Sequence, residues 1–307
     1  MILRVIETTG DDELARVFIG ELSDGARIEF VESVQPPVPR TQKWVLIVST
    51  LKGCPVGCPI CDAGGGYRGK LGSEEIIAQV EHMIRRRYPD GRVLVPKLKI
   101  QFARMGDPAL NDAVLDVLLE LPGRMDIPGL MPAISTVAPW GRDSFMERLA
   151  QIKSEFYPNG RFQMQFSVHT TDAEARRKLI PVRTWNLDKM SEYGERFFEE
   201  GDRKIALNFA PVKGFPLEPS VIGKHFDPRY FMIKLTPVNP TFAAENFGLA
   251  GLINPTDSKQ CSEVVKSFTD QGFDTILSIG DTRENAIGSN CGMYVEAGRR
   301  AATKSDN

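Results

Sequence analysis

The sequence lacks any apolar run long enough to cross a membrane, and it lacks an N-terminal targeting pattern. A membrane-spanning helix needs about eighteen or more consecutive apolar residues, and no segment reaches that length. The first residues turn acidic at Asp11, Asp12 and Glu13, unlike a secretory signal or an Arg-rich transit peptide. We therefore expect a cytoplasmic protein that makes no contact with a membrane.

A basic excess is also absent. Lys and Arg total 38 residues against 40 for Asp and Glu, which gives a net charge of −2. Proteins that hold long nucleic acids through their phosphates usually carry a basic surface, and these totals do not indicate one. The basic triplet at residues 85–87 ends a predicted helix, where cations interact favourably with the helix dipole. We expect these three arginines to form a solvated helix end.

Histidines are scarce, whereas the cysteines are clustered. The chain has three His and five Cys, and Cys54, Cys58 and Cys61 lie within eight residues. An odd number of cysteines in a cytosolic chain of this size does not indicate a disulfide framework. The crowding favours a metal site instead.

The spacing of these cysteines, C-x3-C-x2-C, favours an iron–sulfur cluster. Thiolates are the usual ligands of such clusters, and an electron-carrying [4Fe–4S] cluster takes four, so three ligands leave one iron open to a substrate. Gly53, Gly57 and the glycine run 64–66 let the backbone fold tightly around such a cluster. A structural zinc site is an alternative, although zinc prefers four ligands and no histidine lies in the loop. An ordinary four-cysteine electron-transfer cluster is another.

Beyond the N-terminal region, strand and helix patterns alternate, which predicts a parallel α/β sheet with right-handed crossovers. We expect an α/β fold of the partial (βα)6 barrel type, whose functional residues lie at the C-terminal ends of its strands. Residues 1–40 are predicted to form an N-terminal β-hairpin and a Pro-rich connector, 41–297 the barrel and 298–307 a disordered tail. The predicted hairpin covers 14–33, the later strands 44–49, 98–103, 133–136, 162–168, 205–210, 231–235 and 275–278, and the helices 111–121, 142–152, 187–200, 256–271 and one capped by Ser73.

The cysteine loop is the signature of the radical S-adenosylmethionine (SAM) superfamily. Several further motifs between Glu29 and Cys291 resemble the RlmN/Cfr-type enzymes, which methylate C2 or C8 of an adenine in ribosomal RNA. In chain order they are MGDP at 105–108 followed by Asn111, the pair Ser135-Thr136, Ser167-Val168-His169 with Arg176 and Ile180-Pro181, PVNP at 237–240, and Asp281-Thr282-Arg283 leading to Asn290-Cys291-Gly292.

The resemblance implies a radical SAM barrel with two cofactors, a [4Fe–4S] cluster and SAM, and a reductant such as flavodoxin or ferredoxin. Cys54, Cys58 and Cys61 would hold the cluster. Residues that would bind SAM are Gly106, Asp107, Ser135, Ser167, Val168, His169 and Asn239. For Ser135 and Ser167 the alternative is an ordinary strand-end residue, and for His169 a structural histidine.

The resemblance also implies that Cys291 carries a methyl group. One SAM would methylate its thiolate, and a second, cleaved at the cluster, would activate that methyl group for transfer to a carbon atom. Glu29 corresponds to the family's proposed proton acceptor, with a salt bridge in the hairpin as the alternative. A free buried thiol is the alternative for Cys291.

Three features depart from the family pattern. A hairpin precedes the connector where the family carries a helical RNA-binding domain, Ile47 stands where the family has a second reactive cysteine, and Asp107 replaces a glutamate. With the balanced charge, these features favour a methyltransferase acting on a small molecule or another non-ribosomal acceptor. The alternatives are an rRNA or tRNA adenine methyltransferase of the RlmN/Cfr type, a radical SAM enzyme of another reaction type, and a non-catalytic iron–sulfur or zinc protein.

Overall fold

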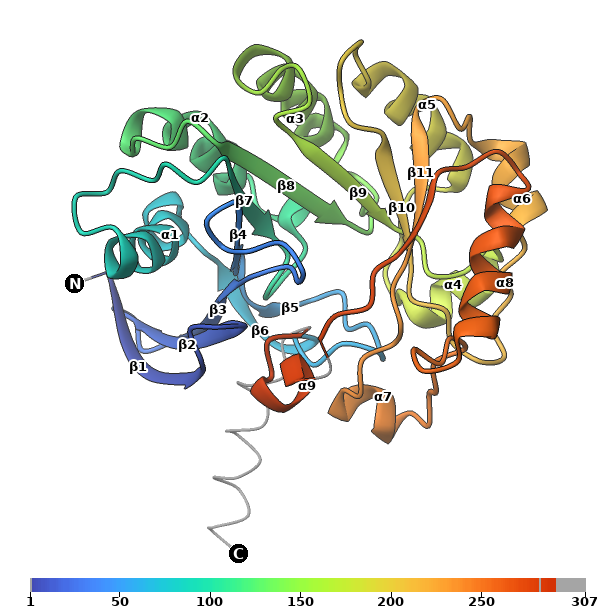
Figure 1. The fold of residues 1–307 in the computed structure, drawn as a ribbon, viewed down its shortest axis with the longest axis horizontal. Coiled ribbons are helices and arrows are strands. Elements are labelled where there is room, and N and C mark those ends of the chain that lie inside the picture. Colours follow the sequence, from blue (N-terminus) through green and yellow to red (C-terminus); the bar gives the residue numbers. More distant parts are fainter. Residues whose placement is uncertain (1, 282, 291–307) are drawn as a thin grey trace, which may run out of the picture. The chain divides into compact units, whose positions relative to one another are not determined.

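The computed structural model describes residues 2–281 and 283–290. The chain divides into two compact units (Figure 1). Unit 1 comprises residues 1–56, 61–134 and the segment that begins at Gly280, and unit 2 comprises residues 57–60 and 135–279. The cysteine loop is therefore shared between the units, with Cys58 in unit 2.

The sheet of unit 1 begins with an antiparallel meander, β1 to β4, and continues with strands β7 and β8, which run parallel to β4. The predicted hairpin is confirmed as β2 and β3. β1 was not predicted, because most of its side chains are exposed and it carries little apolar signal. The strands are β1 (Leu3–Gly10), β2 (Ala15–Leu22), β3 (Arg27–Ser33), β4 (Lys43–Val48), β7 (Lys97–Phe102) and β8 (Leu130–Thr136).

Two long helices of unit 1, α1 (Ser73–Arg87) and α2 (Ala113–Arg124), lie side by side (Figure 1). Ile76, Val80 and Met83 form the buried face of α1, as its apolar periodicity predicts. The predicted cap at Ser73 is wrong, because the extended residue Gly72 precedes the helix and Ser73 already belongs to it. The Glu75 carboxylate instead accepts the Gly72 N–H at 2.8 Å. Unit 1 also contains the 3-10 turn η1 (Pro108–Leu110) and the short helix α9 (Arg283–Ile287).

The basic triplet at the end of α1 is not a simply solvated helix end. Arg86 and Arg87 both contact the fully buried carboxylate of Glu32 on β3, at 2.7 and 2.6 Å, and both contact Asp12, at 2.8 and 2.9 Å. The hydrogen bond from Arg86 lowers the pKa of Asp12 to about 2, and the positive charges of Arg86, Arg16 and Arg87 add to this effect. The expectation of solvation fails because the sequence does not reveal which carboxylates lie opposite the triplet.

Unit 2 is a parallel α/β layer in the strand order β9, β10, β11, β12. Its strands follow the predicted segments closely, and helix α8 packs against β12. Cys261 on α8 is buried, as expected for a core thiol. The elements are β9 (Gln163–Ser167), β10 (Ile205–Phe209), β11 (Phe231–Leu235) and β12 (Thr275–Leu277), with α3 (Asp143–Phe156), α4 (Ala173–Leu179), α5 (Leu187–Phe197), α6 (Pro219–His225), α7 (Phe242–Asn246) and α8 (Ser258–Thr269).

The α/β class with parallel strands and intervening helices is thus confirmed. The short helices α4, α6, α7 and α9 were not predicted, because five to seven residues give too little periodicity to recognise. No helix in the described part of the chain is long and apolar enough to cross a membrane. The predicted tail at 298–307 lies outside the described residues.

Candidate functional site

The first cysteine of the cluster motif lies on a small hairpin of unit 1 that was not predicted. Its strands are β5 (Leu51–Cys54) and β6 (Gly65–Lys70), and Cys54 pairs with Gly65. A Cβ atom at Gly53 would lie 2.7 Å from the carbonyl oxygens of Gly65 and Gly66, and φ is +82° at this position. Only glycine fits there, which brings the two ends of the cysteine loop close together.

The MGDP motif packs directly against this hairpin. The Met105 carbonyl accepts the N–H groups of Thr50 and Leu51 at 2.9 and 3.0 Å. Gly106 has φ +94°, and a Cβ atom there would lie 2.4 Å from Leu51. The buried Asn111 amide donates to the carbonyls of Thr50 (2.8 Å) and Leu71 (2.7 Å). The motif therefore holds both ends of the hairpin that carries Cys54.

Asp107, expected at the SAM site, is buried at the start of η1. Its Oδ1 accepts the Ala109 N–H at 2.9 Å and so caps this turn. The contact fixes the carboxylate at the end of the loop that follows β7. The expected role in binding SAM remains a prediction.

Cys58 lies in unit 2 near the buried guanidinium of Arg176. Burial lowers the pKa of Arg176 to about 10. The charge on Cys58 has a smaller and opposite effect, because it favours the protonated guanidinium. Arg176 donates to the carbonyls of Val137 (3.0 Å), Ser167 (3.1 Å) and Trp185 (2.8 Å). One arginine thus connects the C-terminal end of β9 with the segment after β8 and places positive charge beside a cysteine, a setting that favours a thiolate.

The Ser167-Val168-His169 motif ends β9, as the sequence predicts. The N–H groups of Val168 and His169 donate to the Asn208 carbonyl on β10 at 2.9 and 3.3 Å. His169 has φ +66°, and its Nδ1 accepts the Ala210 N–H at 3.1 Å. Burial, with a smaller contribution from Arg176, lowers the pKa of His169 to about 4. The imidazole is therefore neutral at neutral pH, and its proton lies on Nε2, where it can donate a hydrogen bond.

The other two expected SAM residues of unit 2 lie at or after the ends of strands. Ser135 is half-buried near the end of β8, and the neighbouring Thr136 hydroxyl accepts the Ala138 N–H at 3.0 Å. Asn239 is half-buried after β11, and its carbonyl accepts the Thr241 N–H at 2.8 Å. Strand-end positions are those expected for ligand-binding residues in such a fold, and the individual roles remain predictions.

Glu29 is fully buried in the middle of β3 and forms an ion pair with Arg104, whose Nε lies 3.0 Å from Oε1. Arg104 also donates to the carbonyls of Gly288 (2.6 Å) and Ser289 (2.5 Å). Glu29 thus forms a salt bridge, but with a partner outside the hairpin, and its role as a proton acceptor stays a prediction. The sequence analysis did not select Arg104, although a charged residue directly after a buried strand was a usable signal.

Cys291, the expected methyl carrier, and Thr282 lie outside the described residues. The described segment that leads to Cys291 contains α9 and ends at Asn290. Arg104 therefore contacts the chain two residues before this cysteine. The proposed role of Cys291 stays a prediction.

The donor chemistry of the cysteine loop fits an iron–sulfur cluster. Cys54, Cys58 and Cys61 are half-buried and form no disulfide with one another, so their thiols are available as cluster ligands. In the described part of the chain, no group of three or more Cys, His, Asp or Glu side chains is gathered closely enough to hold a metal ion. Three thiols and no histidine in one glycine-rich loop match a [4Fe–4S] cluster with one open iron better than zinc.

The known proteins that this chain resembles in sequence carry the names of RNA methyltransferases. No protein-family model matches the chain. It is 26% identical to a probable dual-specificity RNA methyltransferase RlmN of Desulfitobacterium hafniense, covering 91% of this chain and 74% of that protein. It is 29% identical to a probable RNA methyltransferase of Ectopseudomonas mendocina, covering 94% and 75%. A ribosomal RNA large subunit methyltransferase N of Nitrosopumilus maritimus is 26% identical, covering 78% and 67%.

The fold resembles the crystal structure of a radical SAM methyltransferase from Sphaerobacter thermophilus, with a TM-score of 0.75 and 21% identity over 95% of this chain and 81% of that one. The fold and the ordered motifs define a radical SAM enzyme, which uses a [4Fe–4S] cluster and SAM. Within that class the chain resembles the RlmN-type methyltransferases, as its motifs predicted.

Proposed function

We propose that this chain is an RNA methyltransferase that transfers a methyl group from SAM to a carbon atom of an adenine. The observation that carries the proposal is the similarity to curated RNA methyltransferases over more than nine-tenths of the chain. The motifs named above fall at the ends of strands and around the cysteine loop, where a radical SAM enzyme needs them.

Each group of residues then has a role. Cys54, Cys58 and Cys61 hold the cluster, which when bound supplies the electron that cleaves SAM. Asn111 and Gly106 keep the β5–β6 hairpin in place. In unit 2, the neutral His169 offers an Nε2–H donor, a group suited to a carboxylate or ribose oxygen of SAM.

Cys291 carries the methyl group in this proposal. A thiolate is the nucleophile in methyl transfer from a sulfonium, and a cationic neighbour lowers the pKa of a thiol. The Arg104 contacts to Gly288 and Ser289 hold the chain just before this residue. The buried Glu29 beside Arg104 is the group that supports proton transfer near this segment.

The relatives favour an RNA acceptor over the small-molecule acceptor that the balanced charge suggested. One observation still favours the small molecule. Ile47 occupies the position of the family's second reactive cysteine, on β4 between Val31 and Gln101 of the neighbouring strands. With isoleucine there, the product has to be released from Cys291 without that thiol.

The test uses the reconstituted holoenzyme with SAM, dithionite and ribosomal RNA transcripts, followed by mass spectrometry of the digested nucleosides. We expect a singly methylated adenosine and one equivalent of 5′-deoxyadenosine for each methyl group transferred. Cys291→Ala should reduce RNA methylation by more than about a hundredfold, because the methyl carrier is lost. Formation of 5′-deoxyadenosine without RNA methylation would exclude the RNA acceptor.

The matched control is Cys261→Ala. This thiol is buried in α8, where its Sγ lies 3.4 Å from the Asn254 carbonyl oxygen, and it belongs to no candidate site. The variant should retain RNA methylation within about twofold of the parent. Equal losses in the two variants would contradict the assignment of Cys291, since both would then report damage to the fold.

A further inference from the structure

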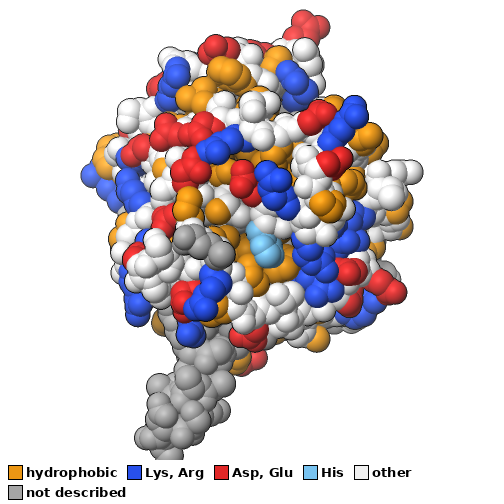
Figure 2. Space-filling view, turned by 90° about the vertical axis from the view of Figure 1, so that its left-hand side faces the viewer, with side chains coloured by type: hydrophobic (Ala, Val, Ile, Leu, Met, Phe, Trp, Pro, Cys, Tyr) orange, Lys and Arg blue, Asp and Glu red, His pale blue; other side chains and the backbone are white. Residues whose placement is uncertain are grey.

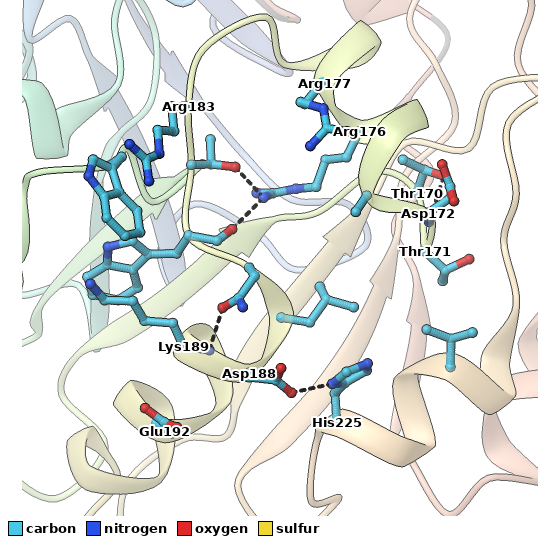
Figure 3. Close-up of a pocket in the computed structure, with 17 residues that line it drawn as sticks. Thr170, Thr171, Asp172, Arg176, Arg177, Arg183, Asp188, Lys189, Glu192 and His225 are labelled. Atoms are coloured by element: carbon cyan, nitrogen blue, oxygen red, sulfur yellow. Dashed lines mark hydrogen bonds and ion pairs between the residues drawn. The ribbon is translucent and has the colours of Figure 1, made fainter.

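A cavity of about 710 Å3 opens within unit 2, between α4, the start of α5 and α6 (Figure 3). It is lined by none of the residues predicted to bind the cluster or SAM, or to carry the methyl group. Two tryptophans and several cations contribute to its wall. These aromatic and basic side chains include Trp140, Arg177, Arg183, Trp185 and Lys189.

The wall of the cavity carries four basic side chains, Arg176, Arg177, Arg183 and Lys189, and three carboxylates, those of Asp172, Asp188 and Glu192. Arg177 and Arg183 are exposed, and neither forms an ion pair with a carboxylate anywhere in the described ranges of the chain. Two of the three carboxylates contact partners other than these arginines. Asp172 accepts the Ala175 N–H at 2.7 Å, and Asp188 contacts His225 Nδ1 at 2.5 Å.

Glu192 and Lys189 do not pair with the two arginines. Glu192 lies well apart from Arg177 and Arg183 in Figure 3. Lys189 is neutralised by an ion pair with Asp143. Arg177 and Arg183 are therefore exposed cations without an ion-pair partner in the described part of the chain, and each suits an anionic group such as a phosphate.

The aromatic part of the wall offers an exposed ring for stacking. Trp140 is 49% exposed, and the Arg183 guanidinium lies 3.9 Å from its ring centroid. Trp185 is 2% exposed, and its Nε1–H has no hydrogen-bond partner.

We propose that this cavity binds an unpaired nucleotide of the RNA substrate, separate from the adenine that is methylated. Arg177 and Arg183 contact its phosphate, and the exposed Trp140 stacks on its base. Aromatic side chains beside cations are the usual means of holding single-stranded nucleic acid. The inference rests on the RNA methyltransferase function proposed above.

The test compares Arg177→Glu with Lys178→Glu. Both residues are exposed on the seven-residue helix α4, and the charge change is the same, but only Arg177 lines the cavity. Binding of a fluorescein-labelled, unstructured RNA of about twenty nucleotides to the reconstituted holoenzyme is followed by anisotropy. Arg177→Glu, Arg183→Glu and Trp140→Ala should each weaken binding about tenfold, whereas Lys178→Glu should change it less than twofold. Arg183→Lys should recover most of the affinity that Arg183→Glu loses.

The outcomes separate the two proposals. If the parent binds and methylates RNA but the three cavity variants bind it as tightly, the cavity assignment fails and the proposed function stands. If Lys178→Glu weakens binding as much as Arg177→Glu, the effect is one of overall charge and the assignment also fails. If the parent neither binds nor methylates RNA, the proposed function itself fails. Melting temperatures within about 2 °C of the parent's exclude unfolding as the cause of lost binding.

Discussion

Asn111 and His169 are single residues whose side chains join segments that lie far apart in the sequence. Asn111 bonds the carbonyls of Thr50 and Leu71 at the two ends of the β5–β6 hairpin. His169 bonds the backbone of Ala210 across the top of β9 and β10. In each case a residue of a motif that resembles one of the family's also fixes the backbone around it.

The depressed pKa of His169 makes the stability of the protein depend on pH. Its folded-state pKa, about 4, lies below the ordinary value of 6.5, so the unfolded chain binds more protons between these values. The free energy of unfolding is therefore unaffected above about pH 7 and falls as the pH is lowered from 6.5 towards 4. Between pH 7.5 and 5.5 the loss from this group should be about 1 kcal/mol.

Urea unfolding of the parent and of His169→Gln at these two pH values tests the prediction. Glutamine retains a side chain that can accept the Ala210 N–H, but it does not titrate. The parent should lose about 1 kcal/mol more than the variant on going to pH 5.5. Equal losses would show that the pKa of His169 is the same in the folded and the unfolded chain.

At the scale of elements, the segment 283–290 is tied to the sheet of unit 1 by Arg104. This residue follows β7, pairs with Glu29 on β3 and donates to two carbonyls just after α9. Ser33 at the end of β3 adds a contact to Glu284 at 3.3 Å. The C-terminal segment is therefore held by a buried charge pair rather than by a strand of the sheet.

Arg104→Met should release this segment and leave Glu29 as a buried charge without its counter-ion. Breaking one side of a buried pair costs about 3–5 kcal/mol, which urea unfolding should detect. If Cys291 carries a methyl group, its occupancy in peptide mass spectra should fall at least about tenfold. The double variant Arg104→Met/Glu29→Gln should regain part of the stability without regaining methylation. Methylation at the parent level in Arg104→Met would show that the Arg104 contacts do not position Cys291.

At the scale of the whole molecule, charge is mixed rather than polarised. The totals are 38 basic and 40 acidic residues, and both kinds are interspersed on the face shown in Figure 2. Such a surface gives little long-range attraction for a polyanion. RNA binding then depends on local contacts such as those of Arg177 and Arg183.

This balance predicts a shallow salt dependence of RNA binding. With about three phosphate contacts on a single strand, the plot of log K against log salt should have a slope of roughly −2. Affinity should then fall about fifteenfold between 50 and 200 mM salt. Anisotropy titrations over this range measure the slope, and Arg183→Glu should make it shallower by about 0.7 or more. A slope steeper than about −6 would contradict a binding mode with few phosphate contacts.

The sequence by itself determined the α/β alternation, the position of most strands, the cysteine motif and the enzyme class. These follow from local signals: apolar periodicity, residue spacing and ordered motifs around Cys54, Gly106 and His169. The resemblance also supplied both cofactors, which the relatives support. Charge totals, in contrast, favoured a small-molecule acceptor that the relatives do not support, because a total says nothing about where charges gather.

Only the tertiary structure decided which distant residues meet. Arg104 reaches Glu29 and Gly288, and the triplet at the end of α1 reaches Glu32 instead of solvent. Arg177 joins Trp140 and Arg183 around one cavity. Side-chain contacts between segments that are many residues apart leave no periodic pattern in the sequence. They arise from the order in which strands pair, and this order brings charged residues together that no local signal connects.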